Sequence, residues 1–530
     1  MKTQGGYYDE QTLFLGEWGP FQRIVFFLLC CSIIPNGFTG LSIVFTGDTP
    51  SHHCHIPAHY NITVQWRNVC IPLEEYGGTI RLGRCTRYRL DLIKSYSDKG
   101  YEPTWNVNVS EMQQEVCKDG WEYDRQQYIS TIVSEWDLVC ADDWKTPVTP
   151  SVFFFGVLTG SFVSGPISDR FGRKIVLFST MAVQTIFTLI QVFSPSWLWF
   201  CALYFIVGMG QISNYVAAFI LGMEIMSPSV RILFGTLGVS LFFVFGYMLL
   251  PLTAYLIRDW RMLQLALTVP GFLCIPLWWF IPESPRWLLS QGRVAEAEAI
   301  LRDAARRNGV TAPEVIFEPQ ANQAEKMESH NICDLVKTNS IRCITIVLCV
   351  VWITLTIGYF ALSLNTPNLN GDSYLNCFLS AAIELPACTA AWLMYRYWPR
   401  RMSLFLTLFQ AGAVLLLIHL IPQRKIHIAI TLEMLGKFGV AAATDIVYAV
   451  TAELYPTVLR NTALGTCSMA SRVGSISAPY FLYLGNYYKS LPYILIGTLS
   501  VLSAFLSLLL PESLGMPLPE SINHMQTISW

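Results

Sequence analysis

One stretch decides the fold of this chain: Gly165-Pro166-Ile167-Ser168-Asp169-Arg170-Phe171-Gly172-Arg173-Lys174. It places a dense cluster of charges between two apolar runs, each long enough to cross a lipid bilayer. The loop is too short to hold a domain, and Gly165 and Gly172 are expected in a turn where two helix ends approach closely. Asp169 and the arginines are expected to pair across that junction. The stretch therefore predicts two membrane helices joined by a charged loop.

The composition agrees with a membrane protein. Hydrophobic residues make up 53% of the 530 positions, charged residues only 14%, and the mean hydropathy is +0.41. Such a chain is too apolar and too sparsely charged for an ordinary soluble protein. A net charge of -2 without any lysine-rich run excludes nucleic acid as a partner. We therefore expect the lipid bilayer to be its main surroundings.

Twelve apolar runs of about 20 residues are candidate membrane helices. They lie near residues 21–45, 148–167, 175–193, 197–221, 232–257, 262–281, 341–364, 374–395, 402–421, 426–450, 462–484 and 491–510. Because the runs are continuously apolar rather than alternating, they indicate helices and not a closed barrel. We predict an all-α membrane protein with twelve transmembrane helices.

The two sets of six runs are related by an internal repeat. Matching residues stand 229 positions apart: Glu224 and Glu453, Arg231 and Arg460, and Pro282-Glu283-Ser284 and Pro511-Glu512-Ser513. The same shift carries the charged loop onto Pro399-Arg400-Arg401, where the aspartate is missing. The pattern predicts two six-helix pseudo-repeats that rock about a site near the middle of the membrane. The expected divisions are a terminus 1–20, a first half 21–282, a linker 283–340, a second half 341–511 and a terminus 512–530.

Residues 48–147 are a polar loop inside the first half, and its sequence indicates the outside of the cell. It holds five cysteines, which are Cys54, Cys70, Cys85, Cys117 and Cys140. It also holds two glycosylation sequons, at Asn61 and Asn108, and both features form outside the cytoplasm. Because five is odd, at least one cysteine is free or intermolecular, and the connectivity stays open.

Basic residues place the opposite side in the cytoplasm. The linker is rich in arginine, and further arginines fall in loops of the same side: Arg396, Arg400, Arg401 and Arg460. Arg424 and Lys425 lie on the other side and oppose the rule. The segment before residue 21 is polar, and no small-residue cleavage site follows the first run. We expect both termini in the cytoplasm and no removable signal peptide.

The motifs resemble those of a transporter family. The spacing Gly-x-x-x-Asp-Arg-x-Gly-Arg-Lys is similar to the signature between the second and third helices of the major facilitator superfamily. Residues 130–140 and 282–288 resemble signatures of the organic ion transporter family, solute carrier 22. Residues 14–23, 33–38, 207–216 and 451–457 resemble its organic cation/carnitine branch, and residues 471–476 and 514–520 lean toward the ergothioneine-transporting member. The resemblance implies gating roles for Asp169, Arg170, Arg173, Glu224, Arg231, Glu453 and Arg460.

The resemblance also bears on disulfides and on sodium. The branch usually carries four loop cysteines, which Cys54, Cys85, Cys117 and Cys140 match, so that Cys70 is the extra one. Asn36 and Gln184 match positions associated with sodium coupling in carnitine transporters. A hydrogen-bonding role between helices is at least as good an explanation for both side chains. Sodium is the only ion that the resemblance implies, and no organic cofactor is expected.

Charged residues inside the apolar runs point to the substrate. Arg472, Glu384 and Asp445 lie in the eleventh, eighth and tenth runs, where ionised groups are costly and mark transport pathways. One positive and one or two negative groups suit a zwitterion, with a carboxylate bound by the guanidinium fork of Arg472. Cation-selective relatives have an aspartate near that position. The alternative is a structural ion pair of Arg472 with Asp445 or Glu384.

Aromatic side chains can bind a quaternary ammonium group by cation–π contact, worth roughly 0.5–2 kcal/mol each. Tyr215 and Tyr359 lie in runs expected to line the central cavity, and Tyr215 belongs to a polar segment. With 13% aromatic residues in the chain, ordinary packing is the more common role for any one ring. We keep both tyrosines as candidate substrate contacts.

Other functions find little support. His52, His53, His55 and His59 surround Cys54, but an exposed loop with an oxidised cysteine is a poor metal site. No set of nucleophile, base and oxyanion donors indicates an enzyme. The leading hypothesis is a plasma-membrane carrier of small zwitterions or organic cations, such as ergothioneine or carnitine, that works by alternating access. The alternatives are an organic-anion exchanger of the same family and a glycosylated receptor or scaffold that does not transport.

Overall fold

The computed structural model describes residues 4–317, 332–422 and 424–512, and twelve long helical segments dominate it. The first half contains α2 (Pro20–Thr39) with α3 (Ile43–Thr46), α7 (Lys145–Phe171), α8 (Arg173–Gln191), α9 (Trp197–Ile225), α10 (Pro228–Leu233) with η4 (Phe234–Gly238) and α11 (Val239–Leu256), and α12 (Trp260–Cys274) with η5 (Ile275–Trp279). The second half contains α15 (Asn339–Leu364), α16 (Ser373–Ala382) with α17 (Glu384–Tyr397), α18 (Arg400–Ile418), α19 (Ile426–Leu454), α20 (Thr457–Tyr483) and α21 (Leu491–Ser507).

These segments confirm the all-α membrane fold. In the described part of the chain, ten of them are long and apolar enough to cross a membrane by composition alone, and α21 is a shorter apolar helix. The remaining segment, α20, carries Arg460, Arg472 and many small polar residues along its length. The predicted boundaries are right to within a few residues, apart from α20, which begins five residues before position 462. Residues 513–530, including the 514–520 motif, lie outside the described residues.

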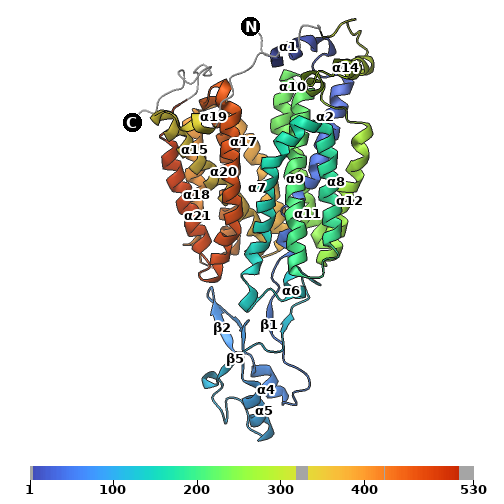
Figure 1. Ribbon diagram of the computed structural model, residues 1–530. Helices are drawn as coiled ribbons and strands as arrows, with labels where there is room; N and C mark the ends of the chain where they lie inside the picture. The colour runs from blue at the N-terminus through green and yellow to red at the C-terminus, as the bar shows by residue number, and fades with distance from the viewer. Residues whose placement is uncertain (1–3, 318–331, 423, 513–530) are drawn as a thin grey trace.

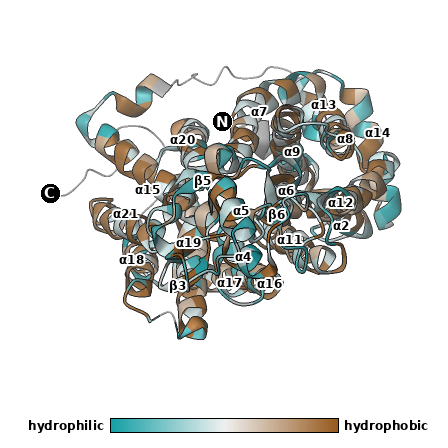
Figure 2. Ribbon diagram, turned by 90° about the horizontal axis from the view of Figure 1, so that it is seen from below, coloured by the Kyte–Doolittle hydropathy of each residue, from teal (hydrophilic) through white to brown (hydrophobic). Residues whose placement is uncertain are grey.

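The two halves stand side by side, and the parts outside the bundle lie at its two ends (Figure 1). At one end, here called the linker end, lie α1 (Gln4–Gln11), η1 (Leu13–Leu15), α13 (Pro285–Ser290), α14 (Val294–Asn308) and η7 (Ile332–Val336). The opposite end, here called the loop end, carries the domain formed by residues 48–147. Seen from the loop end, hydrophobic colour is prominent on helices at the rim, such as α12, α18 and α21 (Figure 2). This arrangement suits a bundle surrounded by lipid.

Three small two-stranded antiparallel sheets and two disulfides hold the loop domain together. The elements are β1 (His52–Cys54), α4 (Val64–Val69), β2 (Leu73–Tyr76), β3 (Thr79–Leu82), β4 (Thr86–Tyr88), α5 (Leu90–Asp98), η2 (Val109–Glu111), β5 (Gln114–Val116), β6 (Trp121–Tyr123), α6 (Ile132–Trp136) and η3 (Cys140–Asp142). The strands pair as β1 with β6, β2 with β3 and β4 with β5. Disulfides join Cys54 to Cys117 and Cys85 to Cys140, and Cys70 is buried and free, as expected. The sequon residues Asn61 and Asn108 are both exposed.

Glycines allow helices to approach each other closely. One of the two glycines predicted in the charged turn, Gly172, lies there, whereas the other, Gly165, does not. Gly172 has a φ of 104° between α7 and α8, as a tight turn requires, and a Cβ there would lie 2.6 Å from Glu283. Gly165 instead lies inside α7, and a Cβ would meet nothing within 4 Å. The expectation that Gly165 forms part of the turn is therefore wrong, because α7 continues to Phe171. Gly246 of α11 does make a close crossing, since a Cβ would lie 2.1 Å from the carbonyl oxygen of Ile34.

The eighth membrane segment is broken rather than continuous. The sequence predicts one helix over 374–395, but α16 ends at Ala382 and α17 begins at Glu384. Pro386 is the physical reason, because it has no N–H to donate to Ala382 and its ring clashes with that carbonyl group. Glu384 is thus in the first turn of α17, where a carboxylate is favoured by the helix dipole.

The halves are packed together only near the loop end of the described structure. One hydrophobic cluster there combines residues of both halves, including Phe38 and Tyr247 from the first and Leu364 and Tyr374 from the second. The other two large clusters belong to one half each. The Phe45 and Tyr374 rings stack across the junction, with centroids 5.1 Å apart. The bundle is therefore sealed at the loop end.

Candidate functional site

The charged loop between α7 and α8 forms an ion-pair network at the linker end. Arg173 donates from Nη1 to Asp169 Oδ1 at 2.8 Å and from Nη2 to Glu224 Oε1 at 3.0 Å. Glu224 also accepts from the hydroxyl of Ser284, and Glu283 accepts from the backbone N–H of Arg173 at 3.2 Å. The predicted pairing across the helix junction is confirmed for Arg173. Arg170 is exposed and lies over the ring of Phe171 instead.

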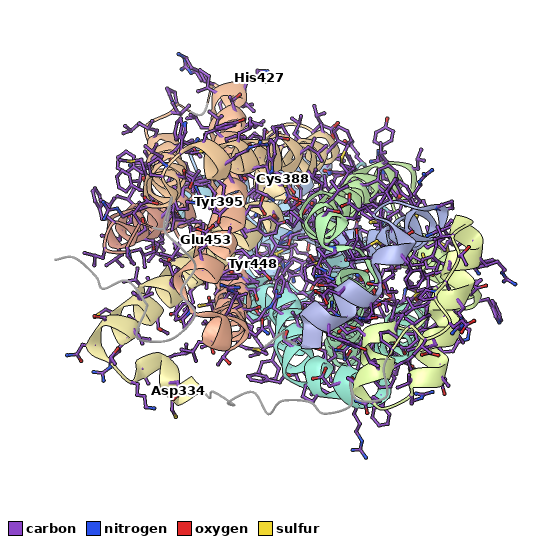
Figure 3. The ribbon with its side chains drawn as sticks, turned by 90° about the horizontal axis from the view of Figure 1, so that it is seen from above. Asp334, Cys388, Tyr395, His427, Tyr448 and Glu453 are labelled. Atoms are coloured by element: carbon purple, nitrogen blue, oxygen red, sulfur yellow. A yellow bond between two sulfur atoms is a disulfide. The ribbon has the colours of Figure 1, made fainter. Side chains whose placement is uncertain are left out.

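The second half repeats this network in a reduced form. Arg400 pairs with Glu453 at 3.4 Å, and Glu512 accepts from the backbone N–H groups of Arg400 and Arg401 at 2.9 and 3.2 Å. The ring of Tyr395 lies 4.2 Å from the Arg400 guanidinium. Figure 3 shows Tyr395 and Glu453 on the second half, seen from the linker end. The weaker network agrees with the degraded motif in the sequence.

Two arginines show the repeat at atomic detail. Arg231 donates from Nε to the carbonyl oxygen of Met223, and Arg460 donates from Nε to that of Ala452, both at 2.7 Å. Arg231 also pairs with Asp9 of α1 at 3.2 Å. The ion pairs of Arg173, Arg231 and Arg400 each lie within one half. Hydrogen bonds across the halves occur at the loop end, as from Tyr483 to Asp143 at 3.0 Å and from Ser151 to the carbonyl of Ile476 at 2.8 Å.

Glu384 forms a buried ion pair that the sequence reasoning missed. Its Oε1 lies 3.5 Å from Nζ of Lys437 on α19, and the two side chains are 7% and 1% exposed. Lys437 also donates to the hydroxyls of Ser363 and Ser380, and its ammonium lies 4.4 Å from the ring centre of Tyr359. The cation nearest to Tyr359 is therefore the protein's own lysine. The rule that identified Asp445 in the same run, an ionised group inside a membrane helix, also applies to Lys437 and Glu433.

In the part of the chain that the structure describes, neither Arg472 nor Asp445 forms an ion pair. Within the described residues, Arg472 forms no ion pair, and its buried Nε has no hydrogen-bond partner. Asp445 is exposed on α19, with the thiol of Cys388 against it. Tyr215, from the first half, lies within electrostatic range of both charges. Cys388 and Tyr448 are marked in Figure 3, which looks into the bundle from the linker end. Tyr215 is thus the residue that senses both charges, and Glu384 pairs with Lys437 rather than with Arg472.

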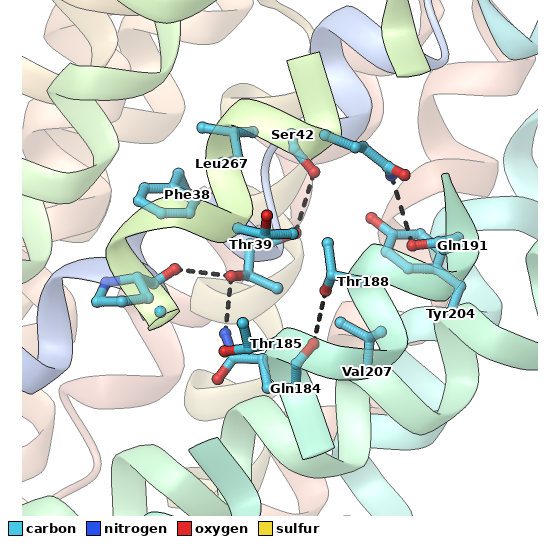
Figure 4. Close-up of a pocket in the computed structure, with 14 residues that line it drawn as sticks. Phe38, Thr39, Ser42, Gln184, Thr185, Thr188, Gln191, Tyr204, Val207 and Leu267 are labelled. Carbon is cyan, nitrogen blue, oxygen red and sulfur yellow. Dashed lines mark hydrogen bonds between the residues drawn. The ribbon is translucent and has the colours of Figure 1, made fainter. Parts of the chain in front are cut away.

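Asn36 and Gln184 lie in the first half, and Gln184 lines a small cavity there. Asn36 donates to Asn214 at 3.0 Å, and its buried Oδ1 has no partner among the described residues. Gln184 donates to the hydroxyl of Thr39 at 2.8 Å and lines a cavity of about 30 Å³ between α2, α8, α9 and α12 (Figure 4). Such a volume holds one or two water-sized ligands. Both side chains do join helices by hydrogen bonds, and Asn36 Oδ1 and the cavity oxygens offer the kind of oxygen donors that a hard cation prefers.

One further carboxyl group stands at the loop end, just outside the membrane helices. The hydroxyl of Tyr128 donates to Asp48 Oδ2 at 2.6 Å. Burial raises the pKa of Asp48 to about 7, while the hydrogen bonds from Tyr128 and from the N–H of Thr49 act in the opposite direction. Asp48 therefore titrates near neutral pH, at the end of the bundle where the halves touch.

Comparison with known proteins places the chain in a transporter family. The model of the sugar (and other) transporter family matches residues 97–524. The chain is 57% identical to mouse organic cation/carnitine transporter 2, over 98% of its own length and 94% of that protein. It is also 57% identical to mouse solute carrier family 22 member 4, over 98% and 95%, and 33% identical to human solute carrier family 22 member 16, over 96% and 90%.

Solved structures confirm the fold. The inward open conformation of the xylose transporter XylE from E. coli superposes with a TM-score of 0.60, at 15% identity, over 95% of this chain and all of that one. Its partially occluded inward open conformation gives 0.61, over 93% and 99%. This likeness shows the major facilitator fold, whereas the relatives define the branch. The chain belongs to the sugar (and other) transporter family and, within it, to solute carrier family 22: it is a membrane transporter and not an enzyme.

Proposed function

We propose that this protein is a plasma-membrane transporter of small zwitterions and organic cations of the carnitine or ergothioneine type. The observation that carries the proposal is the guanidinium of Arg472, which forms no ion pair among the described residues and lies, like the exposed carboxylate of Asp445, within electrostatic range of Tyr215. A half-buried arginine without a counter-ion is costly, and a substrate carboxylate would compensate it with two parallel hydrogen bonds. The names of the relatives, organic cation/carnitine transporters among them, support the same class of substrate.

Asp445 and Tyr215 supply the other half of the site. A quaternary ammonium has no N–H to donate, so that it is held by charge and by aromatic faces. Asp445 offers the charge and Tyr215 the ring. Glu384, which the sequence favoured for this role, has Lys437 as its partner. We therefore propose that Asp445 contacts the substrate cation when it first binds. Glu384 would contact the cation at a later step of the transport cycle.

The two halves would rock about this site by alternating access. The conformation is sealed at the loop end, so that the open side is the linker end. We propose that the linker end and both termini face the cytoplasm, because arginines gather there and the disulfide-bonded loop domain carries two exposed sequons. Asn36 and Gln184 are the residues that we propose for coupling to sodium.

The test is uptake by cells that express the full chain. Uptake of labelled carnitine, ergothioneine and tetraethylammonium is measured in a sodium medium and in a medium in which potassium replaces sodium and no choline is present. Mock-transfected cells give the background uptake. The proposal expects uptake of at least one zwitterion above the mock level. Uptake of an organic anion such as benzoate, with none of the three probes taken up, would contradict it. That result would favour the anion exchanger, for which the unpaired Arg472 is the supporting observation.

A further inference from the structure

The loop domain contains a large pocket that the proposed substrate site does not use. The pocket has a volume of about 1110 Å³, and its walls come from β1, the end of β3 with the turn that follows it, β6 and α6. Two disulfides fix these walls. Cys54, the last residue of β1, is joined to Cys117, and Cys85, directly after Arg84, is joined to Cys140. The pocket is therefore a fixed feature of the loop domain.

Three arginines line this pocket, and two of them have no side-chain partner. Arg81 of β3 pairs with Glu74 at 2.9 Å. Arg84 is half-buried and Arg125 is exposed, and among the described residues neither guanidinium forms an ion pair or a hydrogen bond. A guanidinium that is partly withdrawn from water without a counter-ion is costly, so that Arg84 favours an anion beside it.

The positive charges of the pocket lie close to one another. Burial lowers the pKa of Arg84, and the charge of Arg81 acts in the same direction, although Glu74 partly offsets it. The ring of His52, which also lines the pocket, lies within the field of both arginines, and burial is the main cause of its lowered pKa. Repulsion between the two guanidinium groups destabilises the loop domain, and an anion bound between them would relieve it.

The acidic side chains that line the pocket have partners of their own. Glu122 Oε2 lies 3.5 Å from Nε2 of His53. Glu135 pairs with Arg261 of α12, and Asp124 accepts a hydrogen bond from a backbone N–H group at 3.0 Å. These carboxylates therefore leave the guanidinium groups of Arg84 and Arg125 available to a ligand.

Aromatic side chains supply the rest of the pocket surface. Trp121 and Tyr123 of β6 and Tyr128 all line it. The hydroxyl of Tyr123 donates to Asp137 at 2.8 Å and that of Tyr128 to Asp48 at 2.6 Å, so that the rings are what these tyrosines can offer to a ligand. Guanidinium forks bind phosphate and related oxyanions by two parallel hydrogen bonds, and aromatic rings pack against the apolar face of a sugar.

We propose that this pocket binds a phosphate or sulfate ester of a sugar with at least two negative charges. Arg84 and Arg125 donate to the ester oxygens, Arg81 adds its charge, and the aromatic rings pack against the sugar. A pocket of this size exceeds the needs of one inorganic anion and suits a ligand as large as a disaccharide. The ligand comes either from solution or from the end of a sulfated glycan chain. The site lies in the loop domain, apart from Arg472, so that this inference goes beyond the proposed function.

The experiment measures binding to the purified full chain in detergent by titration calorimetry. The probes are fructose 1,6-bisphosphate for the soluble source, a sulfated heparin disaccharide for the glycan source, and inorganic phosphate and sucrose as controls. We expect at least one of the two esters to bind at least tenfold more tightly than phosphate, and sucrose not to bind. Arg84→Ala should weaken the binding of that ester at least tenfold and Arg125→Ala at least threefold. Arg89→Ala, which removes an arginine of the same domain that pairs with Asp91 outside the pocket, should keep the wild-type affinity.

The tighter of the two esters identifies the source of the ligand. Absence of binding by both esters overturns the inference, as does inorganic phosphate that binds as tightly as they do. An equal loss of affinity in Arg89→Ala and Arg84→Ala would also overturn it, because attraction to any basic surface would then explain the binding. If Arg84→Ala does not fold, Arg125→Ala decides, and an unchanged affinity there contradicts the site. Because no transport is measured, each of these results leaves the proposed function standing.

Discussion

Lys437 and Arg472 are both cations inside the bundle, and their surroundings give them different roles. Lys437 is held by a carboxylate, two hydroxyls and an aromatic ring, so that its charge is compensated within the protein. Among the described residues, Arg472 forms no ion pair, and its Nε has no hydrogen-bond partner. A compensated charge supports the structure, whereas an uncompensated one favours a ligand of opposite charge. This contrast supports Arg472 as the substrate contact.

Replacing Lys437 by Met should destabilise the protein strongly. The methionine fills a similar volume but leaves Glu384 as a buried charge without a partner, which costs about 3–5 kcal/mol in comparable cases. The free energy of unfolding in detergent, obtained from thermal or denaturant curves, checks this. The double variant Lys437→Met with Glu384→Gln should recover much of the loss. If the double variant is as unstable as the single one, the ion pair is not the cause.

Asp48 should make stability depend on pH near neutrality. Its pKa is raised in the folded state from 3.8 to about 7, so between these values the folded protein binds a proton that the unfolded chain has released. The contribution is present in acid and is lost as the pH rises through about 7. Between pH 5 and pH 8, Asp48→Asn should flatten the fall in melting temperature, which corresponds to at most about 3 kcal/mol in the free energy of unfolding. Asp98→Asn, at the exposed end of α5, should keep the wild-type pH curve.

Single residues also show what the sequence could and could not predict. Arg472, Glu384 and Asp445 were found because an ionised residue in an apolar run is visible without a structure. Lys437 and Glu433 obey the same rule and were overlooked in the tenth run. Their partners could not have been predicted from spacing, because Glu384 and Tyr493 come from other helices. The pairing depends on how α17, α19 and α21 pack, which one sequence without relatives does not specify.

At the scale of elements, the break between α16 and α17 fixes the position of Glu384. Pro386 prevents a continuous helix, and the new helix start places Glu384 in the first turn of α17. The hydropathy pattern over 374–395 is apolar on both sides of the break, which explains why the sequence predicted a single helix. A proline inside a run is a visible signal, but Pro270 of α12 shows that a helix can also continue through one.

Pro386→Ala should therefore reduce transport without unfolding the protein. Alanine restores a backbone donor, so that α16 and α17 can join and turn Glu384 away from Lys437. We expect uptake of the transported probe to fall by about tenfold, since small misplacements of a binding group have large effects. The uptake rate and the melting temperature are measured together. Pro270→Ala is the matched control, and an equal loss of uptake there would show a general effect of removing prolines.

At the scale of the whole molecule, the repeat and the seal explain how the halves work. The equivalent contacts of Arg231 and Arg460 show that the halves share one design, and the sequence predicted this from the 229-residue offset. The ion pairs of Arg173 and Arg400 hold each half at the linker end, while Tyr483 and Asp143 join the halves at the loop end. The sequence could not predict which conformation the structure adopts, because the same residues form both states of the transport cycle.

A cross-link at the loop end should stop transport. Asp143→Cys with Tyr483→Cys places one thiol on each half where their side chains meet, and a reversible bifunctional thiol reagent would hold the loop end closed. Uptake is expected to fall to the level of mock cells and to return after mild reduction. Asp143→Cys alone should be unaffected by the reagent. Full activity of the cross-linked protein would contradict a loop-end seal that opens during each cycle.

The central claim is that Arg472 binds the carboxylate of the substrate, and its most direct test is the selectivity of Arg472→Ala. Uptake of labelled carnitine and of tetraethylammonium is measured in the same cells, with Arg306→Ala on the exposed face of α14 as the control. We predict that carnitine uptake falls at least tenfold, while tetraethylammonium uptake is kept or rises, because only the zwitterion loses a partner. An equal loss of both probes would contradict the account.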